Sequence, residues 1–265
     1  MADTQISFSV VTGASSGIGF ELAKIAAENG SDLLICSDGA DINDAAERLR
    51  ETGREVVAVE ADLATIDGVD ALRSKALEIG RPIDALFANA GRGLGNGFLD
   101  QNFADIQRVI DTNVTGTTYL LHRFVNDMRS QGWGKLLITG SIAGLMPGTY
   151  QAVYNATKAY VDSFAWALRE ELSDTGITVT VLMPGPTDTD FFETADMLDT
   201  KVGRGKKDDP AMVAKVGYEA MLRGDGHEVA GLQNKLQAMM ARVTPTAALA
   251  KMHEDMAKPD GGKRH

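Results

Sequence analysis

A tyrosine, a lysine and a serine have the types and the spacing in this chain that are best suited to chemistry. Tyr154 and Lys158 are four residues apart, so on a helix they share one face, and Ser141 precedes the tyrosine by thirteen residues. A nearby ammonium favours the ionised phenol, so we expect Lys158 to lower the pKa of Tyr154 and make it a proton donor and acceptor. The serine hydroxyl can hydrogen-bond the same substrate oxygen and stabilise its charge.

A glycine-rich segment near the N-terminus predicts a site for a dinucleotide. Residues 12–19 follow an apolar run at 8–11 and precede a helical pattern at 20–28. Gly13 allows a tight turn after the strand, and Gly17 and Gly19 let the backbone come close to a pyrophosphate. The backbone N–H groups at the start of the helix attract the phosphates. We expect cofactor contacts here from Gly13, Ser15, Ser16, Gly17, Ile18 and Gly19.

A carboxylate after the second apolar run favours NAD(H) as the cofactor. Asp38 follows the run 33–36 and is nineteen positions beyond Gly19, where it can accept hydrogen bonds from the adenosine ribose hydroxyls. A 2′-phosphate would be repelled there, and no arginine or lysine lies between Lys24 and Arg48 to offset the repulsion. We therefore predict NAD(H), with NADP(H) disfavoured.

These motifs resemble the short-chain dehydrogenase/reductase family when they are joined by residues 89–91, Asn113 and Pro184-Gly185, which occur in the family's order over about residues 5–190. The resemblance implies that Tyr154 is the general acid/base and that Ser141 orients and polarises the substrate oxygen. It also implies that Lys158 holds the nicotinamide ribose and lowers the phenol pKa, and that Asn113 maintains a water between this lysine and solvent.

The same resemblance implies further cofactor contacts. Asn89 and its neighbours would flank the adenine ribose, Asp62 would meet the adenine, and Thr189 would contact the nicotinamide carboxamide. The full implied set is Asp62, Leu63, Asn89, Ala90, Gly91, Tyr154, Lys158, Pro184, Gly185, Thr187 and Thr189. The chain departs from the family pattern at Ala88, Thr157 and Thr187, but none of these changes removes a reacting group.

Composition limits the classes of protein that fit. A chain of 265 residues with 44% hydrophobic and 24% charged residues can form one domain, at about 1–258, without a separate substrate domain. Its net charge of −11 disfavours nucleic acid or an anionic membrane as a partner. The absence of a long apolar stretch and of a secretory signal favours a cytoplasmic protein. Cys36 is the only cysteine, so an intrachain disulfide is impossible. The histidines are scattered, so no metal site is predicted.

Apolar runs alternate with amphipathic stretches, which predicts a doubly wound α/β fold with a parallel Rossmann sheet in three layers. Strands are expected at 8–11, 33–36, 56–59, 85–88, 136–139 and 179–183, and helices near 20–28, 42–52, 67–79, 104–130, 151–173, 210–223 and 232–257. The motifs follow the strands, so they should converge at one edge of the sheet. The methionines after residue 190 are expected to serve as core packing for the helices near 210–223 and 232–257, although a plastic pocket or an interface is an alternative.

Residues 186–205 are predicted to form a substrate lid, because they combine glycines with exposed-looking apolar groups where family members carry one. The pocket is expected to contain Leu94, Met146, Val153, Phe191 and Met197, which suggests a moderately apolar secondary alcohol or ketone. Residues 259–265 are expected to be a flexible tail. By resemblance, helices 104–130 and 151–173 would build a homodimer or homotetramer.

We therefore expect an oxidoreductase that transfers a hydride between NAD(H) and a small alcohol or carbonyl substrate. A catalytically idle NAD(H)-binding redox sensor or scaffold is the alternative. The intact set of Asn113, Ser141, Tyr154 and Lys158 favours the enzyme.

Overall fold

Short runs rich in Val, Leu and Ile form a single parallel sheet in the computed structural model, which describes residues 6–260. The sheet has seven strands in the order β3-β2-β1-β4-β5-β6-β7, and every neighbouring pair is parallel. The strands are β1 (Phe8–Thr12), β2 (Asp32–Ser37), β3 (Val56–Glu60), β4 (Ala85–Ala88), β5 (Gly134–Thr139), β6 (Ile177–Met183) and β7 (His227–Val229). The predicted doubly wound α/β fold is confirmed.

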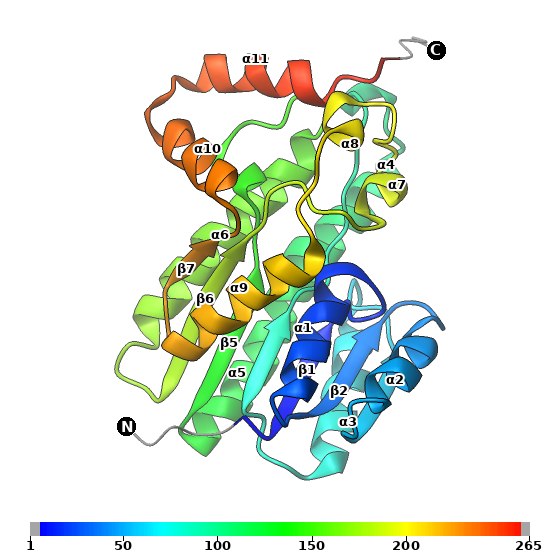
Figure 1. The fold of residues 1–265 in the computed structure, drawn as a ribbon, viewed down its shortest axis with the longest axis vertical. Helices are drawn as coiled ribbons and strands as arrows, with labels where there is room; N and C mark the ends of the chain where they lie inside the picture. The colour runs from blue at the N-terminus through cyan, green and yellow to red at the C-terminus, as the bar shows by residue number, and fades with distance from the viewer. Residues whose placement is uncertain (1–5, 261–265) are drawn as a thin grey trace.

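Helices cover both faces of this sheet (Figure 1). One layer contains α1 (Gly17–Glu28), α2 (Ile42–Arg50) and α9 (Pro210–Arg223), and the other contains α3 (Ile66–Ile79), α5 (Thr117–Gln131) and α6 (Ala152–Glu171). Adjacent strand residues point to opposite layers, so Val10 packs with the second layer and Val11 with the first, and both are fully buried. Burial on both faces explains why the strands read as continuous apolar runs.

The long helix expected at 104–130 is interrupted in its first half. It consists of α4 (Phe103–Ile110), a π-helical segment at Asp111–Gly116 and α5. The chain also packs tightly here, because a Cβ added at Gly116 would lie 1.9 Å from the carbonyl oxygen of Leu63. This close approach holds the π-helical segment against the loop that follows β3.

The helix expected at 232–257 is instead two helices, α10 (Leu232–Val243) and α11 (Thr246–Ala257). Pro245 separates them, because a residue before proline avoids helical geometry, and Thr244 is accordingly extended with ψ 133°. The expected core role of the methionines here was wrong for Met239, Met240 and Met252, which are 52–67% exposed. In α10 the buried positions are instead Asn234, Ala238 and Ala241.

Residues 186–205 contain two short helices, α7 (Phe191–Thr194) and α8 (Lys201–Arg204), beside the carboxyl ends of the strands (Figure 1). Two short 3-10 helices lie at Phe98–Asp100 and Ile142–Leu145. None of the helices between residues 6 and 260 is both long and apolar enough to span a membrane. The predicted tail at 259–265 lies outside the described residues from 261 onward.

Candidate active site

A cavity of about 800 Å³ opens at the carboxyl ends of the strands. The predicted cofactor residues on its wall are Gly13, Ser15, Ser16, Gly17, Ile18, Asp38, Asp62, Leu63, Asn89, Ala90, Gly91, Tyr154, Lys158, Pro184, Gly185, Thr187 and Thr189. Gly19 lies behind the wall. Parallel strands bring residues distant in sequence to one edge, as doubly wound sheets do.

The glycines of the turn after β1 stand where side chains would not fit. Gly13 and Gly17 have positive φ values of 64° and 55°, a backbone conformation that glycine adopts readily. A Cβ added at Gly19 would lie 1.9 Å from the carbonyl oxygen of Gly13 and 2.5 Å from the Asn89 amide nitrogen. The turn can therefore bring backbone N–H groups at the start of α1 against a bound phosphate.

The end of β4 is fastened to the same turn. The hydroxyl of Thr12 accepts hydrogen bonds from the backbone N–H of Asn89 at 3.0 Å and of Ala90 at 3.1 Å. The Asn89 side chain donates to the carbonyl oxygen of Gly13 at 3.2 Å and accepts from the Thr139 hydroxyl at 3.0 Å. One asparagine thus joins β1, β4 and β5 beneath the cavity.

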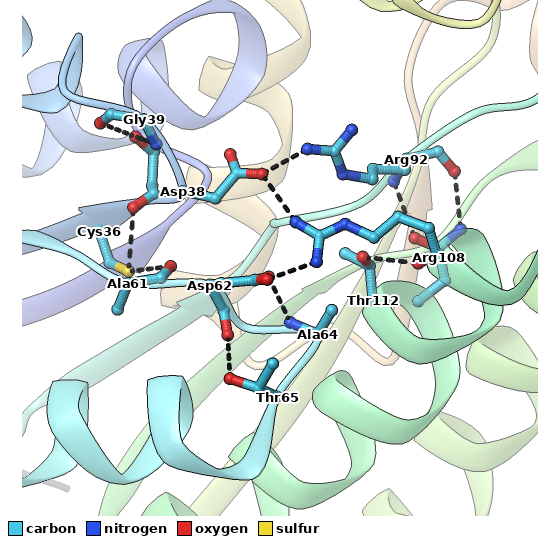
Figure 2. A network of polar contacts seen from close by, with 12 residues as sticks. Cys36, Asp38, Gly39, Ala61, Asp62, Ala64, Thr65, Arg92, Arg108 and Thr112 are labelled. Atoms are coloured by element: carbon cyan, nitrogen blue, oxygen red, sulfur yellow. Dashed lines mark hydrogen bonds and ion pairs between the residues drawn. The ribbon is translucent and has the colours of Figure 1, made fainter. Parts of the chain in front are cut away.

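Two arginines meet the carboxylates at the cavity end beside β2 and β3. Arg92 and Arg108 both pair with Asp38, and Arg108 also pairs with Asp62 (Figure 2). Partial burial raises the pKa of Asp62, but the bond from Arg108, the backbone N–H of Ala64 and the charges of Arg108 and Arg92 together hold that pKa below the ordinary value. The sequence argument for NAD(H) counted only arginines and lysines close to Asp38 along the chain, and so it missed both partners.

Ser141, Tyr154 and Lys158 come together on the cavity wall and are each at least 90% buried. Tyr154 and Lys158 lie one turn apart on α6, and Ser141 follows β5. The Lys158 ammonium donates to the carbonyl oxygen of Thr139 at 2.9 Å, and the Ser141 hydroxyl accepts from the backbone N–H of Ala143 at 3.1 Å. The three predicted reacting groups therefore face one volume.

Burial dominates the protonation of this site. It raises the pKa of Tyr154 to about 12, with the Ser141 hydroxyl lowering it and Asp162 raising it further. Burial also lowers the pKa of Lys158 to about 8, against the opposing effect of Asp162. The expected lowering of the phenol pKa was wrong for this state of the protein, because loss of water disfavours the phenolate more than its neighbours favour it.

Asp162 is a buried acid that the sequence analysis missed. One carboxylate oxygen accepts from the backbone N–H of Ser141 at 3.4 Å, and the other has no hydrogen-bond partner among the described residues. Burial raises its pKa to about 7, although Lys158 lowers it. Gly140 and Gly144 make room for it, since a Cβ on either would come within 2.3 Å of the carboxylate. Its spacing of four from Lys158 was a usable signal, because it extends the helix face that carries Tyr154.

Asn113 lies behind the cavity wall. Its amide donates to the carbonyl oxygen of Arg92 and to the Thr157 hydroxyl, both at 2.9 Å, and accepts from the backbone N–H of Arg92 at 2.8 Å. A Cβ added at Gly91 would be 3.4 Å from both the Asn113 oxygen and the Lys158 ammonium, so the two side chains border the same glycine. Thr157, a departure from the family pattern, is what anchors this asparagine to α6.

Only part of the predicted substrate pocket lies on the cavity wall. Met146 and Phe191 line it, and the Phe191 ring is 5.1 Å from the Tyr154 ring. Leu94 is not on the wall, Met197 is buried in a small cluster that segment 186–205 forms with Ala257, and Val153 faces a separate shallow hollow. These three predictions were wrong because helical and loop positions near the site point away from it.

The C-terminal helix supplies pocket residues that no motif marked. His253 and Met256 of α11 line the cavity. The His253 ring nitrogen Nδ1 contacts the carbonyl oxygen of Thr149 at 2.9 Å, and the Asn155 amide lies 3.3 Å from Nε2. Since His253 is 5% exposed, these contacts fasten α11 over the pocket.

Segment 186–205 also touches the opposite side of the cavity. The backbone N–H of Gly95 donates to the carbonyl oxygen of Ala195 at 2.8 Å, and a Cβ on Gly93 would collide with the Phe191 ring at 2.4 Å. Within residues 6–260, no cluster of three or more His, Cys, Asp or Glu side chains is suited to a metal ion. The groups available for chemistry are thus the phenol, the ammonium, the hydroxyl and the buried acid.

Comparisons with known proteins agree with this geometry. Residues 8–197 match the family described as short chain dehydrogenase. An uncharacterised oxidoreductase from Staphylococcus epidermidis is 30% identical over 202 residues, which cover 76% of this chain and 86% of that protein. A short-chain dehydrogenase from Sphingobium yanoikuyae, solved with NADPH, is 28% identical with a TM-score of 0.79 and covers 91% of this chain and 97% of its own. A Burkholderia phymatum enzyme solved with NAD shares the fold, with a TM-score of 0.83 at 23% identity over 91% of this chain and 94% of that one.

Proposed function

Because the chain belongs to the short-chain dehydrogenase/reductase family of oxidoreductases, we propose that it interconverts a moderately apolar secondary alcohol and its ketone with NAD(H). The observation that carries this proposal is the convergence of Ser141, Tyr154 and Lys158 on a cavity that continues to the glycine turn after β1. The glycine-turn end of the cavity suits a dinucleotide. The other end holds a proton donor, Tyr154, where the reacting half of that dinucleotide would lie.

The chain's residues suit a nicotinamide dinucleotide. The glycine turn would take the pyrophosphate, Asp38 and Asn89 the adenosine half, and Lys158 and Thr189 the nicotinamide half. Bound in this way, the cofactor supplies or accepts the hydride. Asp38 at the end of β2 supports NAD(H), because its carboxylate can accept from both ribose hydroxyls.

Tyr154 would move the proton. With its pKa raised to about 12, the phenol is neutral at pH 7, which is the form that gives a proton to a ketone oxygen during reduction. Ser141 would hydrogen-bond the same oxygen and orient it. Lys158, held on the Thr139 carbonyl, would bring a cation beside the phenolate that remains.

Apolar side chains on the cavity wall suit the substrate end. Met146, Phe191, Phe192 and Met256 are among them, and His253 adds a polar group. These side chains favour a carbonyl flanked by hydrocarbon, because they help to exclude water from the proton transfer. We propose that segment 186–205 acts as the lid over this end, with Phe191 against the Tyr154 ring.

Replacing the proton donor tests the proposal. Tyr154→Phe should lower kcat for a ketone by about 10²- to 10⁴-fold, the usual contribution of general acid–base catalysis, while leaving NADH affinity nearly unchanged. Tyr160→Phe is the matched control, because that tyrosine is on the same helix, is 41% exposed and bonds the Thr118 hydroxyl. Full activity in the Tyr154 variant would refute the role. Tight NADH binding by the wild type without turnover of any alcohol or carbonyl would favour an idle redox sensor.

We further propose a cytoplasmic homodimer or homotetramer that associates through α4, α5 and α6. Exposed apolar side chains support this surface, since Phe98, Phe103 and Ile110 are 40–71% exposed near the shallow hollow that contains Val153. Light scattering that detects only a monomer would remove the assembly from the proposal.

A further inference from the structure

Four charged side chains gather at the end of the cavity that faces the adenosine half of a dinucleotide (Figure 2). Asp38 follows β2, Asp62 follows β3, Arg92 follows β4, and Arg108 belongs to α4. Arg92 bonds Asp38, while Arg108 bonds Asp62 and reaches Asp38 at 3.3 Å. Four separate elements thus supply two positive and two negative charges to one corner.

Both guanidinium groups remain partly exposed, and Arg92 lies on the cavity wall. The side chains of Arg92 and Arg108 are 43% and 36% exposed, and that of Asp38 is 42% exposed. A guanidinium has five N–H donors, and Arg92 contacts Asp38 through a single terminal nitrogen. Donors are therefore left over for a further acceptor beside the carboxylate.

The charges around Asp38 change what the site can accept. An isolated carboxylate at the end of β2 repels a phosphate on the ribose 2′ position. Here two guanidiniums stand within bonding distance of that carboxylate, and arginine forks match phosphate oxygens in geometry as well as charge. The repulsion is offset, and bonding partners for a phosphate are already in place.

We propose that Arg92 and Arg108 form a 2′-phosphate subsite, so that this chain binds NADP(H) as well as NAD(H). The inference rests on the proposed function, because it assumes that adenosine lies at this corner. With NAD(H), the guanidiniums stay on Asp38 while its carboxylate accepts from the ribose hydroxyls. With NADP(H), they turn toward the phosphate, and Arg108 keeps its bond to Asp62.

Binding of two small nucleotides to the whole protein, measured by calorimetry, tests the subsite without any turnover. Wild-type protein should bind 2′,5′-ADP at least as tightly as 5′-AMP. Arg92→Gln and Arg108→Gln should each lower the affinity for 2′,5′-ADP by about tenfold or more and change the affinity for 5′-AMP by less than about threefold. Arg54→Gln is the matched control, because Arg54 pairs with Asp32 at the opposite end of β2 and should change neither affinity.

Two further measurements keep the result interpretable. Asp38→Asn should raise the affinity for 2′,5′-ADP relative to that for 5′-AMP. Circular dichroism should show that each arginine variant remains folded. Wild-type protein that binds 5′-AMP more than about 100-fold tighter than 2′,5′-ADP would overturn the subsite and leave the proposed function standing. If the arginine variants lose affinity for both nucleotides equally, the arginines only support the structure, and the 2′-phosphate subsite is overturned as well. Failure to bind either nucleotide would remove both proposals.

Discussion

Replacing Asp162 with asparagine should stabilise the protein in alkaline solution, by an amount that shrinks as the pH falls toward 3.8. The acid is 7% exposed, and burial raises its pKa from an ordinary 3.8 to about 7. Between these two values the folded protein keeps a proton that the unfolded chain has lost, so stability falls as the pH rises through this window. Asparagine keeps the oxygen that accepts from the Ser141 N–H but has no charge to bury.

The size of the effect follows from the same pKa values. A rise from 3.8 to about 7 is about three pKa units, which at about 1.4 kcal/mol each amount to about 4 kcal/mol. Lys158, whose pKa is lowered to about 8, is mostly neutral at pH 9, so its lost attraction to Asp162 matters little there. For a chain of this length, about 4 kcal/mol corresponds to a Tm higher by about 8 to 16 °C.

Thermal unfolding followed by circular dichroism at pH 5 and pH 9 measures this difference. At pH 5 the unfolded wild type has already lost the proton that the folded protein keeps, so Asp162→Asn should be more stable by only about 1.7 kcal/mol, which raises Tm by about 3 to 7 °C. Glu170→Gln removes an exposed carboxylate from the same helix and should give the same small difference at both pH values. A variant that is no more stable than the wild type at pH 9 would show that Asp162 is not a buried acid of raised pKa.

Two other substitutions probe the cavity. Gly19→Ala places a methyl group 1.9 Å from the Gly13 carbonyl oxygen, so overpacking should cost about 1 to 3 kcal/mol of stability. The affinity for NADH should fall at least tenfold. An unchanged Tm and an unchanged NADH titration would contradict the tight turn. His253→Ala removes the contacts of α11 with Thr149 and Asn155, which should destabilise this helix by about 1 to 3 kcal/mol. Hydrogen exchange in α11 should become faster, while the affinity for NADH stays unchanged. Exchange as slow as in the wild type would show that other contacts hold α11.

The elements that the sequence predicted are those whose residues alone determine their structure. Strands β1, β2 and β4 are buried on both faces, and so each appears as an uninterrupted apolar run. β7 was not predicted, because its three residues include an exposed histidine and it exists by pairing with β6. The break at Pro245 was visible in the sequence, but amphipathic spacing continues on both sides of it.

The same distinction applies to the site. The glycine turn and the pair of Tyr154 and Lys158 are local patterns, so their meeting on one wall could be predicted once a parallel sheet was assumed. The partners of Asp38 could not, because Arg92 and Arg108 lie 54 and 70 residues away in sequence. The direction of the phenol pKa also depends on burial, which is a property of the packed protein and not of residue spacing.

The π-helical segment between α4 and α5 holds one residue more than regular α-helical bonding would need, because its hydrogen bonds span five residues instead of four. A turn of this kind takes up the extra residue locally, so the helix beyond it keeps nearly the same rotational phase. Phe124 and its neighbours in α5 therefore still face the sheet, while Asn113, inside the wider turn, reaches the Arg92 backbone. An extra residue can thus serve a polar site without rotating the hydrophobic face of the helix that follows.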